Sequence, residues 1–206
     1  CLLNHDRNPN LTRGQIEANL RDYLGCDTVL WLKAGVYRDE TKGHIDNFCR
    51  FVAPGEVVLT WTEDRNDPQY AISAEALARL GQMRDARGRK LVVHKLHQPA
   101  PVLISAEEAA GVDPVEGTLP RREGDRLAAS YVNFYIGNGV VVMPAFDDPM
   151  DAEAQATLGD LFPTRQIIAV AGREILLGGG NIHCITQQQP SAFTHKSHVA
   201  LQSAGS

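Results

Sequence analysis

The residues best suited to chemistry lie in one run near the end of the sequence, Gly178–Pro190. Three consecutive glycines open this run, a single cysteine, Cys184, follows them, and a polar stretch completes it. Because glycine has no Cβ, such a loop accepts backbone conformations and close approaches that other residues exclude. A thiol presented by this loop is suited to attack a bound molecule. An ordinary buried cysteine beside a glycine-rich turn is the other interpretation.

A histidine and a carboxylate, His44 and Asp46, lie far upstream in the sequence. If Ile45 lies in a strand, both side chains point to the same side of it. A cysteine nucleophile, a histidine that moves protons and a carboxylate that anchors the substrate are the parts of a thiol enzyme. His183 adjoins Cys184, but in an extended loop its side chain would face away, which predicts a structural role.

The same side chains are also metal-ligand types, so a metal site is an alternative. A zinc site would use His44, Asp46, His183 and Cys184, but no Cys-x-x-Cys or His-x-x-x-His spacing supports it. We therefore predict no metal, and the thiol chemistry requires no organic cofactor. The other cysteines, at positions 1, 26 and 49, are scattered and are predicted to have no chemical role. Their spacing favours a reducing compartment.

The Cys184 run closely resembles the active-site signature of the agmatine deiminase family, whose members modify guanidines. Further stretches resemble the same family in the same order, and the resemblance covers about residues 1–190. These stretches are Leu2–Asn4 with Arg7–Pro9, Gly43–Asn47, Trp61–Thr62 with Asp67–Tyr70, Ala86–Arg89 and Arg126–Tyr135. A long, ordered set of matches is more specific than any single motif.

The resemblance implies an α/β fold of the pentein type, a propeller of five ββαβ units around a central channel, of which about three are expected here. Residues 1–190 would form the C-terminal part of the deiminase domain, and the Ser-, Ala- and Gly-containing residues 191–206 a disordered tail. The family is longer at its N-terminus, and this sequence opens with Cys1. We therefore expect further acidic substrate-binding residues upstream and little or no activity from the chain as it stands.

The resemblance also implies a reaction, the hydrolysis of agmatine to N-carbamoylputrescine and ammonia in polyamine synthesis. Cys184 would form a covalent thiouronium, His44 would transfer protons, and Asp46 would bind the guanidinium. Gly180 and Asn133 are predicted as further substrate-binding residues. An arginine or peptidyl-arginine deiminase is an alternative within the same chemistry. A non-catalytic fragment or partner chain is an alternative outside it.

The chain is expected to alternate hairpins, helices and strands, with the order hairpin–helix–strand appearing twice and partly a third time. Residues 98–126 are expected to form a long connection. The predicted elements are a helix capped by Thr12 and ended by Gly25, a strand over 28–32, a hairpin over 48–52 and 57–61, a helix from about Ile72 to Gly88, a strand over 91–96, a hairpin over 131–136 and 140–143, a helix over 150–161 and a strand over 166–170.

Composition agrees with an enzyme that acts on a small molecule. The 206 residues are 43% hydrophobic and carry a formal net charge of −5, with no long basic run, so no nucleic-acid partner is expected. An acidic balance suits a small cationic substrate such as agmatine. No apolar stretch approaches the roughly 20 residues that a membrane helix needs, so no membrane partner is expected. We predict a cytoplasmic protein and leave open a homo-oligomer.

Overall fold

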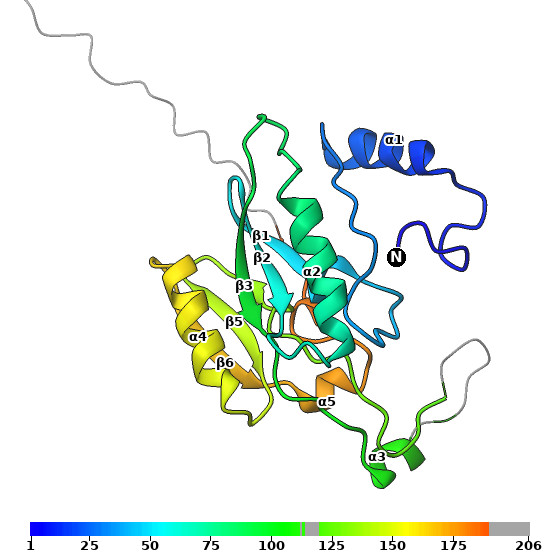
Figure 1. Cartoon of the computed structure of the whole chain (residues 1–206), viewed down its shortest axis with the longest axis vertical. Coiled ribbons are helices and arrows are strands. Elements are labelled where there is room, and N and C mark those ends of the chain that lie inside the picture. Colours follow the sequence, from blue (N-terminus) through cyan, green and yellow to red (C-terminus); the bar gives the residue numbers. More distant parts are fainter. Residues whose placement is uncertain (112, 114–119, 190–206) are drawn as a thin grey trace, which may run out of the picture.

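The computed structural model describes residues 1–111, 113 and 120–189 of the chain. Its centre is built from two small mixed sheets, each with a helix packed beside it (Figure 1). The predicted tail over 191–206 lies outside the described residues.

The first sheet has the strand order β1-β2-β3. Strands β1 (Cys49–Ala53) and β2 (Glu56–Trp61) form an antiparallel hairpin, while β3 (Val92–His97) pairs parallel to β2. Helix α2 (Pro68–Leu80) lies between β2 and β3 in the sequence, because parallel neighbours need a long crossover connection. This confirms the first predicted hairpin–helix–strand unit.

The second sheet repeats the arrangement. Strands β4 (Tyr135–Ile136) and β5 (Val140–Ala145) are antiparallel, and β6 (Gln166–Ala171) pairs parallel to β5 after helix α4 (Met150–Leu161). Two hairpin–helix–strand units are therefore present. Residues 1–44 contain a helix but no strand, so no third unit is seen among the described residues.

The first helix, α1 (Arg13–Leu24), has the ends that the sequence predicts. Thr12 and Gln15 form a reciprocal capping box at its start. Gly25 ends it in the left-handed conformation at φ 65°, where a residue with a Cβ would be strained. The remaining short elements are the 3-10 turn η1 (Ile45–Asn47), the helices α3 (Ala106–Ala110) and α5 (Arg173–Leu176), and the 3-10 turn η2 (His183–Ile185).

Three predicted elements need correction. Residues 28–32 form no strand and pair with none, although Leu30 and Leu32 pack against the buried cluster that includes Phe48, Leu59 and Leu80. Apolar residues there reflect burial alone, since a strand also needs a hydrogen-bonding neighbour. Helix α2 ends at Leu80 and does not reach Gly88, because Asp85 instead accepts backbone N–H bonds within a tight turn.

The first strand of the second hairpin is shorter than the predicted strand, which begins at Tyr131. Strand β4 begins only at Tyr135. The preceding residues, 131–134, are buried, and the side chain and carbonyl of Asn133 bond to the loop that carries Cys184. These residues therefore connect the sheet to the candidate site.

One of the hydrophobic clusters joins the two units. Val58 of β2 and Leu96 of β3 pack in the same cluster as Phe134, Met143 and Leu158 of the second unit. A polar contact lies near it, where the Thr60 hydroxyl meets that of Ser130 at 2.8 Å and donates to the carbonyl of Asn47 at 3.0 Å. The elements that hold the candidate site are thus fixed to one another.

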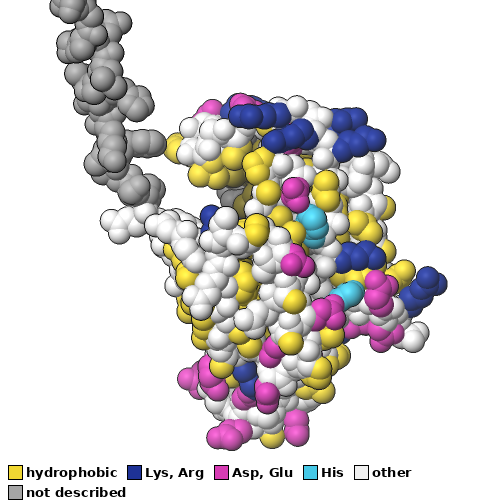
Figure 2. Space-filling view, turned by 90° about the vertical axis from the view of Figure 1, so that its left-hand side faces the viewer, with side chains coloured by type: hydrophobic (Ala, Val, Ile, Leu, Met, Phe, Trp, Pro, Cys, Tyr) yellow, Lys and Arg dark blue, Asp and Glu magenta, His cyan; other side chains and the backbone are white. Residues whose placement is uncertain are grey.

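The surface carries both signs of charge. Several basic side chains gather at one end of the face in Figure 2, acidic and further basic ones are spread over the rest, and the histidines lie beside acidic side chains. Hydrogen bonds between histidine and carboxylate link β3 to its neighbours, His94 with Glu56 at 2.8 Å and His97 with Glu153 at 2.6 Å. Within the described ranges, no helix has the length and apolar character to cross a membrane.

Candidate active site

The loop that carries Cys184 is fixed by buried polar contacts. Asn181, which is 1% exposed, donates from Nδ2 to the carbonyl of Gly172 at the end of β6 and accepts the N–H of Ile182 on Oδ1. The backbone N–H of Cys184 donates to the carbonyl of Asn181 at 2.9 Å. Cys184 lies in the turn η2 and is exposed, so its thiol is presented by a rigid support.

Gly180 has a steric role beside this thiol. A Cβ at position 180 would lie 2.6 Å from Sγ of Cys184 and 2.8 Å from its Cβ, much closer than van der Waals contact. The sequence suggested that Gly180 contacts the substrate. That contact stays a prediction, and the geometry adds a steric reason for glycine here, because the Cys184 side chain occupies the adjacent space.

Replacing Gly180 with alanine should therefore displace the Cys184 side chain. We expect alkylation of Cys184 by iodoacetamide and turnover of substrate to change together, turnover falling by about tenfold to a hundredfold, since misplacement of reacting groups by about 1 Å is costly. Gly14→Ala is the matched control, because nothing lies within 4 Å of a Cβ at that position. Unchanged turnover in Gly180→Ala would contradict the steric role.

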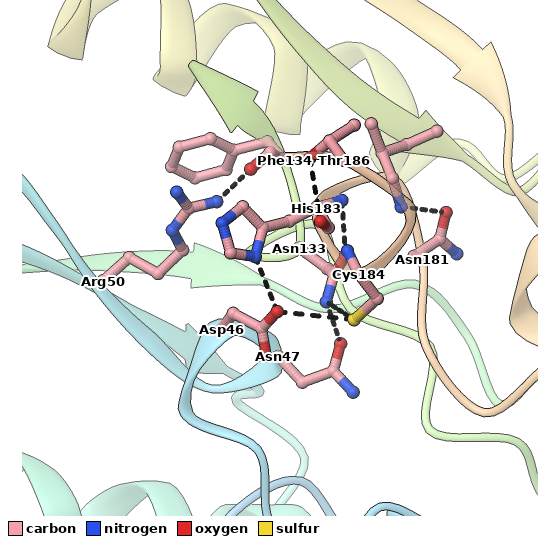
Figure 3. A network of polar contacts seen from close by, with 10 residues as sticks. Asp46, Asn47, Arg50, Asn133, Phe134, Asn181, His183, Cys184 and Thr186 are labelled. Atoms are coloured by element: carbon pink, nitrogen blue, oxygen red, sulfur yellow. Dashed lines mark hydrogen bonds and ion pairs between the residues drawn. The ribbon is translucent and has the colours of Figure 1, made fainter. Parts of the chain in front are cut away.

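Asp46 and Cys184 lie in contact. The Cys184 thiol donates to Oδ2 of Asp46 at 3.3 Å, and His183 donates from Nδ1 to the same oxygen at 2.6 Å (Figure 3). The sequence predicted that Cys184 and Asp46 would share a site, and the structure brings them together. The sequence argument placed Ile45 in a strand, whereas in the structure Ile45 lies in the turn η1.

The two histidines lie differently from the sequence expectation. His44, the predicted proton carrier, accepts a hydrogen bond from Arg7 at 2.7 Å and has no hydrogen bond to Cys184 in the described structure. His183 was expected to face away from the site, yet its ring bonds to Asp46. That expectation assumed an extended loop, and in the 3-10 turn η2 neighbouring side chains do not alternate between opposite faces.

Asn133 lies behind the thiol. Its Nδ2 donates to Sγ of Cys184 at 3.1 Å and to Oδ1 of Asn47 at 2.7 Å, and its Oδ1 accepts the backbone N–H of His183 at 2.9 Å. Asn133 is fully buried, at 0% exposure. Both polar atoms of its side chain therefore bond to the protein, and its contact with substrate stays a prediction.

The surroundings lower the pKa of Asp46 and raise that of Cys184. Burial raises the pKa of Asp46, but hydrogen bonds from His183 and Cys184 more than offset it, so that its pKa lies below the usual value. Burial raises the pKa of Cys184, the neighbouring Asp46 raises it further, and the hydrogen bond from Asn133 lowers it. At neutral pH this leaves an ionised carboxylate beside a protonated thiol.

Arg50 is a site neighbour that sequence reasoning did not single out. Its guanidinium donates to the carbonyl of Phe134 and lies 4.6 Å from the centroid of the Phe134 ring. Burial lowers its pKa, while the charges of Asp46 and Cys184 raise it. The only signal in the sequence was a charged residue within a predicted strand. Arg50 clamps the backbone next to Asn133 and adds positive potential near the thiol.

An open cavity of about 890 Å³ adjoins the site, with Asp46, Arg50 and His183 in its wall. The other side chains of the wall are largely apolar and come from α1, β1, β2 and the segments around them. The carboxylate of Asp46 thus lies between a space that can admit a ligand and the thiol of Cys184.

The remaining cysteines differ from Cys184. Cys49 is buried within β1, and burial raises the pKa of its thiol to about 12, which leaves it unreactive. Cys1 and Cys26 are partly exposed and form no disulfide. Over the described ranges, no three His, Cys, Asp or Glu side chains converge closely enough to hold a metal ion.

Comparison with known proteins extends over nearly the whole chain. Agmatine deiminase of Pseudomonas aeruginosa (strain UCBPP-PA14) is 59% identical over 191 residues, which is 93% of this chain and 52% of the relative. The solved structure of agmatine deiminase of Enterococcus faecalis, described as catalyzing its reaction, matches with a TM-score of 0.85 and 46% identity over 92% of this chain and 52% of that one.

A more distant structure, a C. jejuni agmatine deiminase with substrate bound, matches with a TM-score of 0.71 and 27% identity over 89% of this chain and 48% of that one. The chain thus spans about half the length of the curated relatives it matches. The family model described as Porphyromonas-type peptidyl-arginine deiminase matches residues 1–190. The chain belongs to this Porphyromonas-type peptidyl-arginine deiminase family.

Proposed function

We propose that the protein containing this chain is an agmatine deiminase, which hydrolyses agmatine to N-carbamoylputrescine and ammonia. The observation that carries the proposal is the 3.3 Å contact between the thiol of Cys184 and the carboxylate of Asp46. The nucleophile, Cys184, therefore lies within one hydrogen bond of Asp46, the carboxylate that can bind a cationic group. Relatives named agmatine deiminase, up to 59% identical to this chain, favour agmatine among the guanidine substrates.

Asp46 binds the guanidinium of the substrate in this proposal. A carboxylate accepts paired, parallel N–H bonds from a planar guanidinium, which fixes both the orientation and the position of its central carbon. The lowered pKa of Asp46 keeps the carboxylate ionised at neutral pH. Its side chain is 17% exposed, so the ion pair with substrate would form largely out of water and be stronger for it.

Binding of the substrate also activates the thiol. Without substrate, the Cys184 thiol donates a hydrogen bond to Asp46, and the negative charge of Asp46 raises the pKa of Cys184. A bound guanidinium neutralises that charge and takes over the carboxylate oxygens. The thiol proton then passes to His44, and the thiolate becomes the favoured form when an electrophilic carbon lies beside it.

The reaction proceeds through a covalent intermediate. The Cys184 thiolate adds to the guanidinium carbon, and the tetrahedral adduct expels ammonia after His44 protonates the departing nitrogen. This leaves a thiouronium on Cys184. A water that loses a proton to His44 attacks the same carbon, and breakage of the C–S bond releases N-carbamoylputrescine. One imidazole can serve both steps because its reference pKa is about 6.5.

Variants of the two histidines test this assignment of roles. We expect His44→Ala to lower turnover by about a hundredfold or more and to accumulate the thiouronium, since neither proton transfer is then assisted. His183→Ala should mainly raise KM, because His183 bonds to the carboxylate that binds substrate. The measurement is kcat and KM with mass spectrometry of the quenched enzyme. If His183→Ala stalls with the adduct and His44→Ala does not, the two roles are exchanged.

The proposal extends to the fold and the setting of the whole protein. The two ββαβ units would belong to a ring of five around a central channel, with residues 1–190 as one part of that domain. The enzyme would be cytoplasmic and would serve putrescine synthesis, and a homo-oligomer is compatible with this proposal. Shared ββαβ order in the two sheets and the match to residues 1–190 support the fold.

Substrate choice is the experiment that tests the function itself. The protein containing this chain should release ammonia from agmatine and discriminate strongly against arginine, whose additional carboxylate would have to be buried without a partner. Ammonia release measured with both substrates at equal concentration decides between them. Comparable turnover of arginine would reject the agmatine assignment and leave the deiminase chemistry in place.

A further inference from the structure

The side chain of Asn133 holds both the thiol and the backbone of the nucleophile loop. Its Oδ1 accepts the N–H of His183 at 2.9 Å and that of Cys184 at 3.4 Å. Its carbonyl oxygen also accepts the N–H of His183, at 3.2 Å. All of these contacts are made by a residue with 0% exposure, so no water competes for them.

These backbone contacts fix which way the Asn133 amide points. A backbone N–H can only donate, so the atom that faces residues 183 and 184 must be the oxygen. The Nδ2 group, a donor with no accepting capacity, is therefore the one that faces Sγ of Cys184 at 3.1 Å. A donor in this position favours a sulfur that accepts, and a thiolate is a far better acceptor than a thiol.

The orientation of the Asn133 amide also fixes that of Asn47. Its Oδ1 must accept the second N–H of Asn133, at 2.7 Å, which turns its own Nδ2 away. That Nδ2 is buried and has no hydrogen-bond partner among the described residues. A buried donor without a partner destabilises a fold, so its presence calls for an explanation. The orientation that leaves Nδ2 of Asn47 unpaired is the one that aims a donor of Asn133 at the sulfur.

We propose that Asn133 is a positioning residue which, oriented by Asn47, aims an N–H donor at Sγ of Cys184 and so favours its thiolate form. The proposal rests on the proposed function only in taking Cys184 as the nucleophile. It adds a role for two buried asparagines, Asn47 and Asn133. Asn133, in the segment before β4, contacts the sulfur, and Asn47, in η1, contacts Asn133, so both segments are coupled to η2.

Other charged and titratable groups also act on this sulfur. Asp46 contacts it directly, His183 and His44 influence Asp46, and the positive charge of Arg50 interacts with both Asp46 and Cys184. None of these side chains bonds to the side chain of Asn133 or Asn47, and Asn47→Leu also leaves the backbone bonds of residues 183 and 184 to Asn133 in place. A change in the titration of Cys184 in those variants therefore reports on the amide donor.

The experiment measures the rate at which iodoacetamide alkylates Cys184 across the pH range, with mass spectrometry of the peptide that carries it. Thiolate sulfur forms the new C–S bond and iodide leaves, so the rate follows the thiolate fraction. Asn133→Ala should raise the midpoint by about one unit or more and lower the rate below the midpoint by about tenfold. Asn138→Ala, at an exposed turn residue, is the matched control and should match the unchanged protein.

Asn47→Leu is the second variant, for the case that Asn133→Ala does not fold. It removes the unpaired donor and the acceptor together, so we expect thermal stability to change little while the midpoint rises by a smaller amount. An unchanged midpoint in every folded variant would overturn the proposal. Alkylation needs no substrate, so a shifted midpoint would support the role of Asn133 whether or not agmatine is hydrolysed. If the midpoint shifts but agmatine is not hydrolysed, only the proposed function is rejected.

Discussion

Replacing Cys184 with serine should lower the turnover of agmatine by about four orders of magnitude or more. An alcohol is far less ionised than a thiol at neutral pH and is a weaker nucleophile, so the covalent step would be nearly lost. Binding should change little, because Asp46, which anchors the guanidinium, keeps its bond to His183. Single-turnover ammonia release with saturating agmatine measures the chemical step directly.

Cys26→Ser is the matched control for this variant. Cys26 is partly exposed, and its sulfur makes only a long contact of 3.9 Å with the carbonyl of Leu24. We expect its turnover to be unchanged. If Cys184→Ser retained more than about a tenth of the original turnover, the nucleophile would have to be another group.

Asp46→Asn should have opposite effects on two reactions of the same protein. Turnover of agmatine should fall by the equivalent of about 2–5 kcal/mol, mostly through KM, because the guanidinium loses its charged partner in a desolvated site. Alkylation of Cys184 by uncharged iodoacetamide should accelerate, because the negative charge of Asp46 raises the pKa of the thiol. A general loosening of the site would not produce this combination.

Asp160→Asn supplies the control for the change of charge. Asp160 is an exposed residue near the end of α4, so the same substitution there should alter neither reaction. Slower alkylation of Cys184 in Asp46→Asn would contradict the electrostatic relation between the two residues, and unchanged agmatine turnover would remove Asp46 from substrate binding.

Much of the fold was predictable because its signals are local. Thr12 with Gln15 and Gly25 define both ends of α1 through backbone capping, and the turn at Pro54 and Gly55 joins β1 to β2. The strand expected over 28–32 failed for a non-local reason. Whether an apolar segment becomes a strand depends on a neighbour to pair with, and composition does not contain that information.

The site was predictable in part. Cys184 and Asp46 could be brought together from residue types and a family signature, although they are 138 positions apart in the sequence. The environment of Cys184 and Asp46 could not be predicted. The burial of Asn133, the orientation of Asn47 and the clamp formed by Arg50 depend on how the two units pack, and packing is not visible in the sequence.

The most direct test of the mechanism is the mass of the enzyme caught during turnover. His44→Ala, mixed with agmatine and quenched in acid, should carry the mass of agmatine less ammonia on the peptide that contains Cys184, and the modification should disappear as product forms. Modification of Cys1, Cys26 or Cys49 instead, or ammonia release with no covalent species at any time, would contradict covalent catalysis by Cys184.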